Sequence, residues 1–203
     1  MNGKTRREKE RVARRKQILA AARVVFSRKG YHHSTLEEIA RKAQLGKGTT
    51  YWYFSGKAEL FLAVLEGVID EQLLKVKQAA SEKADCRSRI EGIAREQLEH
   101  FAKNQFLTRI LSSEVVFKTQ EMKRRMKRSI DERYAVYTEL VEDVLREGIS
   151  RREIRRVDVK KMSHVLLSVL HSLVYYWHIK EIKPRPAEDA RMVCDLVFEG
   201  LER

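Results

Sequence analysis

Apolar side chains recur every three to four residues through most of the chain, which is the pattern of amphipathic helices. The first clear stripe begins at Ile18 and continues to Phe26, and Gly30 then offers the left-handed conformation that ends many helices. Further stripes predict helices over 34–43, 46–54, 57–83, 87–103, 105–117, 119–149, 158–181 and 186–202. No run alternates apolar and polar residues, so the pattern predicts an all-α protein of about nine helices.

Composition supports this fold class and limits where the protein works. The 203 residues include only two prolines, and 43% of them are apolar, which is enough for a sizeable core. No stretch of about 18 uncharged apolar residues occurs, so we expect no membrane span. Cys86 and Cys194 stand apart from each other and from any His partner, as small buried side chains in a reducing cytoplasm would. The expected location is therefore cytoplasmic.

Positive charge is concentrated in the first part of the chain. Residues 1–60 hold 15 Lys and Arg against 5 Asp and Glu, whereas residues 61–203 hold 27 against 24. A uniformly charged surface would not divide in this way. An anionic partner for the N-terminal part is the simplest interpretation, and nucleic acid is the commonest such partner.

The basic start of the chain, residues 1–16, has no apolar face to bury. It is either a solvated helical extension or a flexible arm. Its role is equally open: it could act as a solubilising tail, or it could contact DNA phosphates or enter a minor groove.

Residues 31–60 have the pattern of two short helices joined by a tight turn. A capping box starts the first of them, formed by Thr35 with Glu38 or, in a second register, by Ser34 with Glu37; Lys47 and Gly48 open the second. A helix held at a fixed angle by a partner helix is what a major groove about 12 Å wide admits. The side chains suited to phosphates and base edges are Thr35, Lys47, Gly48, Thr49, Tyr51, Trp52 and Tyr53, with Lys57 placed to clamp the backbone from the next helix.

Residues 16–65 resemble the DNA-binding head of the TetR family of bacterial repressors. The resemblance rests on an ordered, ungapped set: Phe26, Gly30-Tyr31, Thr35, Ile39-Ala40, Lys47-Gly48-Thr49, Tyr51, Phe54, Lys57 and Glu59-Leu60. It implies an all-helical homodimer with a C-terminal ligand-binding body, and it implies that Thr35, Lys47, Thr49, Tyr51, Trp52, Tyr53 and Lys57 face DNA. Three departures bear on the operator sequence rather than the fold: Gln44 replaces a usual Gly, Gly46 a usual Ser or Thr, and Thr50 a larger aliphatic.

The expected organisation is a basic arm (1–16), a helix-turn-helix domain (17–60) and a ligand-binding and dimerisation domain (61–203). The predicted helix over 158–181 is apolar on most sides, so one side needs its own core and the other needs a second subunit. Two such helices from each chain would form a four-helix bundle, although a monomeric core is the alternative. The expected dimer contacts are Val169, Leu173, Met192, Val193, Leu196, Val197 and Leu201.

The middle helices are rich in aromatic residues and methionine, which could line an apolar cavity or form ordinary core. His164 and His171 lie seven residues apart, a rise of about 10 Å, so two of the helix's histidines would not share a metal ion. We find no catalytic constellation, and we predict no enzyme activity, cofactor or metal. The candidate ligand residues are Phe101, Phe106, Ile110, Met122, Met126, Tyr134, Tyr137, His171 and Trp177.

These features together predict a ligand-responsive transcriptional repressor. As a homodimer it would bind a palindromic double-stranded operator, and a mostly apolar small molecule, for example one with an acyl chain, would release it. One alternative is an architectural DNA-binding protein without a ligand switch. Another is a helical small-molecule-binding or catalytic protein whose basic head meets RNA or an anionic membrane, but we find neither catalytic residues nor a basic amphipathic face.

Overall fold

The computed structural model describes residues 6–104 and 119–199. Within these ranges the chain forms eight helices and no strand, which confirms the predicted all-α class. The predicted helix over 105–117 lies outside the described residues. So do three predicted site residues, Phe106, Ile110 and Leu201.

The described residues divide into two compact units. The first runs to Gly67 and also includes residues 119–126; the second begins at Val68 and includes residues 127–199. Helices α4 (Lys57–Ala80) and α7 (Gln120–Ser150) therefore each contribute residues to both units.

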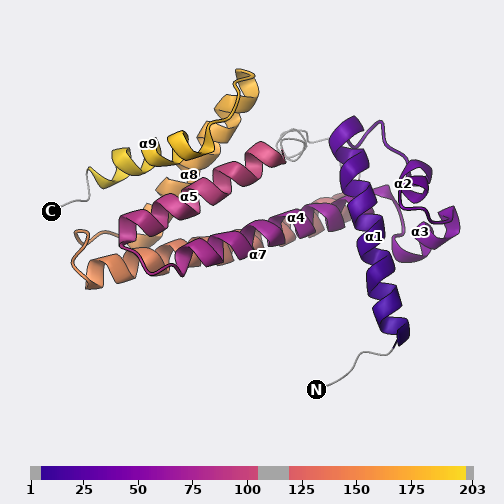
Figure 1. Ribbon diagram of the computed structural model, residues 1–203, viewed down its shortest axis with the longest axis horizontal. Helices are drawn as coiled ribbons and strands as arrows, with labels where there is room; N and C mark the ends of the chain where they lie inside the picture. Colours follow the sequence, from indigo (N-terminus) through magenta and orange to yellow (C-terminus); the bar gives the residue numbers. More distant parts are fainter. Residues whose placement is uncertain (1–5, 105–118, 200–203) are drawn as a thin grey trace. The chain divides into compact units, whose positions relative to one another are not determined.

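The first unit is built on α1 (Arg6–Lys29), α2 (Leu36–Lys42), α3 (Lys47–Tyr53) and the start of α4. Figure 1 shows α2 and α3 beside the C-terminal half of α1. Phe26 and Phe61 meet edge to face at the centre, with ring centroids 5.2 Å apart. The fully buried apolar side chains around them are Ile18, Ala22, Ile39 and Leu60. This core fixes the two short helices against α1.

Two turns in this unit adopt the left-handed conformation. Gly30 has φ 73° and ends α1, as its sequence position predicts. Gln44 has φ 54° in the turn between α2 and α3, where a side chain costs about 1 kcal/mol relative to glycine. At the start of α2, the Thr35 hydroxyl accepts a hydrogen bond from the Glu38 backbone N–H at 3.1 Å. Of these features, the Gln44 turn is the one that redirects the chain between α2 and α3.

Residues 6–16 belong to α1 and are exposed to solvent. The described part of the basic N-terminal segment is therefore a helical extension and not a flexible arm. Ile18 is the first side chain of α1 that is fully buried.

The second unit contains α5 (Cys86–Lys103), α8 (Val159–Ile179), α9 (Pro186–Phe198) and most of α7. Helix α5 packs along α9, and α8 contacts both. Figure 1 shows the α4 segment alongside α7, where the Arg133 guanidinium bridges to the Asp70 carboxylate at 2.8 Å. The buried side chains between these helices include Ile93, Leu98, Leu145, Leu166, Leu170 and Phe198.

Both cysteines lie in this second core. Cys86 and Cys194 are buried, and burial raises the pKa of each thiol to about 12. They therefore remain protonated at neutral pH and pack as small apolar side chains, as the sequence predicts. Among the described residues, no helix combines the length and the apolar character needed to cross a bilayer.

Candidate nucleic-acid interface

Helix α3 is anchored on one side and open on the other. Thr50 is fully buried and Phe54, the residue that ends the helix, is 2% exposed. On the opposite side Tyr51 is 44% exposed and Trp52 is 67% exposed, which is unusual for such large side chains. The anchoring residues thus hold α3 in one orientation while its other face stays free to meet a partner.

The open face also includes Gly48, near the start of α3. A Cβ atom built on Gly48 would meet no other atom within 4 Å, so nothing inside the protein requires glycine at this position. Glycine is unfavourable inside a helix by about 1 kcal/mol relative to alanine. Glycine here is explained if an external surface comes close to the α3 backbone.

Lys47 lies beside these residues as an exposed cation. Its ammonium group forms an ion pair with Glu37 of α2 and lies 5.8 Å from the centre of the Tyr51 ring. The hydrogen bond with Glu37 raises the pKa of Lys47 and lowers that of the carboxyl group, so both remain charged. An exposed pair of this kind contributes little to stability, so Lys47 can exchange Glu37 for a phosphate at little cost.

The remaining predicted side chains of the head lie around the same helix. Tyr53 is half-buried and meets Trp52 edge to face, with ring centroids 4.7 Å apart. Thr49 is also half-buried. Thr35 caps α2, but a hydroxyl that accepts one hydrogen bond can still donate another.

Lys57 has a different environment from the one expected. Its ammonium group donates hydrogen bonds to the carbonyl oxygens of Tyr31 (2.8 Å), Ser34 (2.8 Å) and His32 (3.3 Å). It also lies 4.5 Å from the centre of the Tyr31 ring. An ammonium group has three N–H donors, and all three are used within the protein. In the structure Lys57 therefore holds the loop between α1 and α2, and its ammonium group is not available to contact the DNA backbone as predicted.

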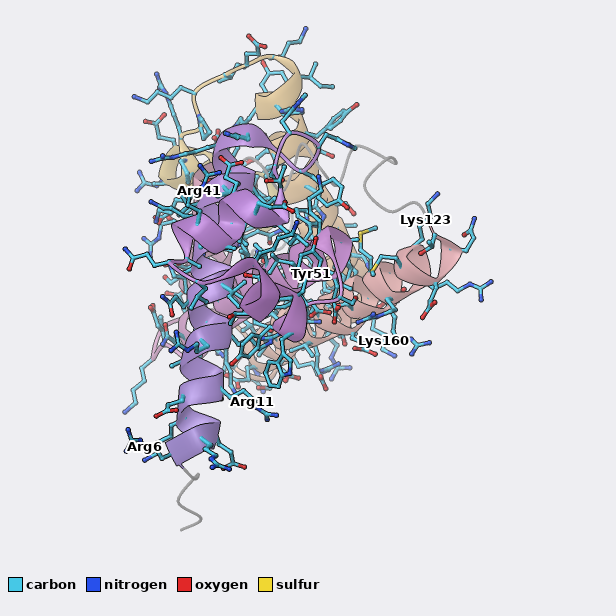
Figure 2. The ribbon with its side chains drawn as sticks, turned by 90° about the vertical axis from the view of Figure 1, so that its right-hand side faces the viewer. Arg6, Arg11, Arg41, Tyr51, Lys123 and Lys160 are labelled. Atoms are coloured by element: carbon cyan, nitrogen blue, oxygen red, sulfur yellow. The ribbon has the colours of Figure 1, made fainter. Side chains whose placement is uncertain are left out.

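Two cations that the sequence pattern did not single out join this region. Arg41, in the last turn of α2, is exposed, and Figure 2 shows it on the face that also carries Tyr51. Arg15 of α1 lies with its guanidinium carbon 5.3 Å from the centre of the Phe54 ring. A search for cations near the ends of α2 and α3 would have suggested Arg41, but the Arg15 contact depends on the packing of α1.

In the second unit, three of the candidate ligand residues come together. The His171 ring meets the Phe101 ring edge to face, with centroids 5.9 Å apart. It also stacks against the Tyr134 ring, with centroids 6.4 Å apart. The Tyr134 hydroxyl also lies 3.1 Å from Nδ1 of His164. Partial desolvation of the ring lowers the pKa of His171, so the ring is neutral at pH 7, although the residue as a whole remains exposed. The cluster joins α5, α7 and α8.

Other candidate ligand residues have structural partners instead. Tyr137 is buried and its hydroxyl donates to Oε1 of Gln97, while Trp177 is buried and its indole N–H donates to Asp189 at 3.1 Å. Met122 and Met126 are half-buried and belong to the first unit. The nine predicted residues therefore do not form one described site.

The residues predicted to form the dimer interface fall into an exposed group and a buried one. Met192 and Leu196 are 50% and 68% exposed, and Val169, Leu173 and Val197 are partly exposed. Val193, by contrast, is fully buried in its own chain between α9 and its neighbours, so it is not available to a second subunit. The sequence placed it on the wrong side of α9 because adjacent positions of a helix both look apolar.

A hollow of about 590 Å³ lies in the second unit, where the end of α4 meets α5 and α7. Its rim is charged, with Lys83, Asp85, Asp143, Arg151 and Glu153 among the lining residues. Arg89, at its base, donates to the Ala80 carbonyl at 2.8 Å and pairs with Glu147 at 2.5 Å. These contacts satisfy the buried guanidinium, and the polar lining does not suit an apolar ligand.

Known proteins of similar sequence share this architecture. The fatty acid metabolism regulator protein of Bacillus subtilis is 23% identical over 186 residues, which span 91% of this chain and 94% of that protein. The solved structure of the fatty acid degradation regulator FadR from Bacillus halodurans matches with a TM-score of 0.75 at 21% identity over the full length of both chains. FadR from Bacillus subtilis in complex with stearoyl-CoA matches with a TM-score of 0.74 at 22% identity, covering 91% of this chain and 98% of that one.

Family models match both parts of the chain. Residues 18–64 match the bacterial regulatory proteins of the tetR family, and residues 83–201 match the tetracyclin repressor-like C-terminal domain. Together these matches cover the helix-turn-helix unit and nearly all of the second unit. The chain therefore belongs to the TetR family of bacterial regulatory proteins, which are DNA-binding transcriptional regulators and not enzymes.

Proposed function

We propose that this regulator reads its operator with α3, which enters the major groove. The observation that carries the proposal is the two-sided character of α3: buried Thr50 and Phe54 fix it, while exposed Tyr51 and Trp52 lie on its free face beside Gly48. Base edges and thymine methyl groups are within the chemistry of Thr49 and Trp52. Lys47 and the hydroxyls of Thr35, Tyr51 and Tyr53 suit phosphates, which position the helix without reading sequence.

Lys57 has a positioning role in this proposal. By holding three carbonyls of the loop between α1 and α2, it fixes the start of α2 against α4. The angle of α2 in turn sets the angle of α3. Loss of Lys57 would therefore disturb DNA binding through the geometry of the head.

We propose further that two copies bind a palindromic operator. The support is the apolar surface on α8 and α9, where Val165, Met192 and Leu196 are each at least half exposed in the single chain. Apolar side chains at this exposure are normally covered by a partner when they gather on neighbouring helices. Two half-sites would then lie about one helical turn apart, or a small multiple of it.

The effector in this proposal is a long-chain acyl compound of the acyl-coenzyme A class. Its support is twofold: the solved relative from Bacillus subtilis is a complex with stearoyl-CoA, and this chain has the Phe101, Tyr134 and His171 cluster between α5, α7 and α8. A neutral imidazole between aromatic rings tolerates an apolar chain while offering one hydrogen bond.

Coupling between effector and operator has a structural route. Helices α4 and α7 contribute residues to both compact units, and no glycine- or proline-rich linker separates the head from the body. An effector acts only if it binds one arrangement of the protein better than the other. A coupling free energy of about 1–3 kcal/mol would change operator affinity by about 5- to 150-fold.

The test is a reciprocal titration with stearoyl-CoA. The operator is first selected from a random-sequence duplex library by the wild-type protein. Stearoyl-CoA affinity is then measured by calorimetry with and without that duplex, and duplex affinity with and without stearoyl-CoA. Linkage requires the two ratios to be equal. Selection of a duplex together with equal stearoyl-CoA affinity in both states would leave a DNA-binding protein without this switch.

A further inference from the structure

Helix α1 continues well beyond the head that it helps to build. Residues 6–17 are exposed, and Ile18 is the first fully buried side chain. Between Arg6 and Lys16 the helix carries seven Lys and Arg against two Glu. Arg15 and Gln17 contact the head, but residues 6–14 are exposed and gain little stability from tertiary packing, so packing does not explain why they are there.

The cations of this extension lie on more than one face, and one face continues the buried stripe of α1. Residues spaced at i, i+4, i+7 and i+11 lie on the same side of a helix, and in α1 these positions are Arg7, Arg11, Arg14 and Ile18. From Ile18 onward that side packs onto the head. We call Arg7, Arg11 and Arg14 the basic stripe.

The basic stripe therefore projects on the side of α1 where α3 lies. The contact of Arg15 with the Phe54 ring shows that this end of the helix passes the C-terminal end of α3. Figure 2 shows Arg11 on α1 below Tyr51, and Arg6 further towards the N-terminus. The stripe and the free face of α3 thus belong to one surface of the first unit.

No ion pair joins Arg7, Arg11 or Arg14 to another of the described residues, whereas Arg6 pairs with Glu10 at 3.1 Å. Like charges three and four residues apart destabilise a helix, so an unneutralised stripe has a cost. An anionic surface facing the stripe would remove this cost of repulsion.

We infer that the basic stripe binds the phosphate backbone of the DNA that flanks the half-site read by α3. This inference rests on the proposed entry of α3 into the major groove. From Arg15 to Arg7 the helix rises about 12 Å, which corresponds to about three to four base pairs at 3.4 Å each. The stripe therefore lengthens each half-site contact by at most that amount, without reading its sequence.

The helical state of the extension excludes one of the interpretations that the sequence left open. An α-helix with its side chains is about 10–12 Å wide, whereas the minor groove of B-DNA is about 6 Å wide. A helical extension cannot enter that groove as an extended arm can. Contact of its side chains with the phosphate backbone is the geometry that we infer for this helix.

The test compares two triple variants with the same net charge. The stripe variant carries Arg7→Gln, Arg11→Gln and Arg14→Gln. The control variant carries Arg6→Gln, Lys9→Gln and Lys16→Gln, which lie on other faces of the same exposed segment. Because all six side chains are exposed, neither variant should lose its fold, and circular dichroism checks this.

Affinity is measured at several salt concentrations for duplexes that carry the selected operator with 0, 2, 4 or 6 flanking base pairs on each side. The wild type should gain affinity as the flanks lengthen and reach a plateau near 4 base pairs. The stripe variant should lose this gain and about five units of the salt slope, because each protomer of the proposed dimer loses three phosphate contacts and each contact contributes about 0.9. The control variant should keep the flank dependence and most of the slope.

Equal losses in the two triple variants would overturn the inference, because they would indicate general electrostatic attraction. A wild-type affinity that does not depend on flank length would overturn it as well. Failure of the proposed function looks different: the wild type would then select no duplex from the library at all.

Discussion

Replacement of Lys57 by methionine separates a role in the fold from a direct role in DNA binding. Methionine keeps an unbranched apolar stem but removes the ammonium group that donates to Tyr31, His32 and Ser34. The two short hydrogen bonds are partly buried, and a buried carbonyl that loses its donor costs about 1 kcal/mol. The cation–π contact with Tyr31 adds about 0.5–1 kcal/mol.

The expected loss of stability is therefore about 2–3 kcal/mol. For a chain of this size each kcal/mol lowers the melting midpoint by about 2–4 °C, so we expect a decrease of about 5–10 °C. Operator affinity should fall, but the slope of log affinity against log salt concentration should stay near the wild-type value. The assays are a thermal melt followed by circular dichroism and a salt titration of operator binding.

Lys47→Met is the matched control, since Lys47 is exposed and its ion pair with Glu37 lies at the surface. This variant should melt within a few degrees of the wild type and lose about two units of salt slope, one from each protomer of the proposed dimer. The reasoning about Lys57 is refuted if Lys57→Met leaves the melting midpoint unchanged and lowers the salt slope by about two units, as loss of one phosphate contact per protomer would.

Three further substitutions test the head and the dimer face. Gly48→Ala should leave thermal stability unchanged or raise it by about 0.5–1 kcal/mol, yet it should weaken operator binding at least tenfold. Gly67→Ala, also in open space, should stabilise the protein without affecting operator binding. Equal losses of operator affinity in the two variants would contradict this explanation of Gly48. Leu196→Glu should give monomers in light scattering because it places a charge in the proposed interface, and Leu74→Glu, at a similarly exposed position, should leave the dimer intact. Trp52→Ala should change which duplexes are selected from a random library while leaving the salt slope unchanged, and an unaltered selection would remove Trp52 from base recognition.

Much of this molecule follows from local sequence alone. The apolar spacing from Ile18 to Phe26 and the cap at Gly30 define where α1 packs and where it ends. The Thr35 cap places the start of α2. These features are readable because each depends on residues within one or two turns of each other. The charge division between residues 1–60 and the rest is likewise a property of the sequence alone, and it indicates the class of partner.

Only the tertiary structure decided which of several chemically similar residues is buried, which is exposed and which is already held by hydrogen bonds within the protein. Lys57 meets carbonyls 23 to 26 residues earlier in the chain, and no local pattern shows that its donors are already used. Val193 and Leu196 belong to the same apolar stripe, yet one is fully buried and the other 68% exposed, because packing of α9 on its neighbours selects the covered side. The side on which the basic stripe projects is decided in the same way, by the burial of Ile18 against the head. Periodicity gives the faces of a helix, and only contacts between distant segments assign each face its partner.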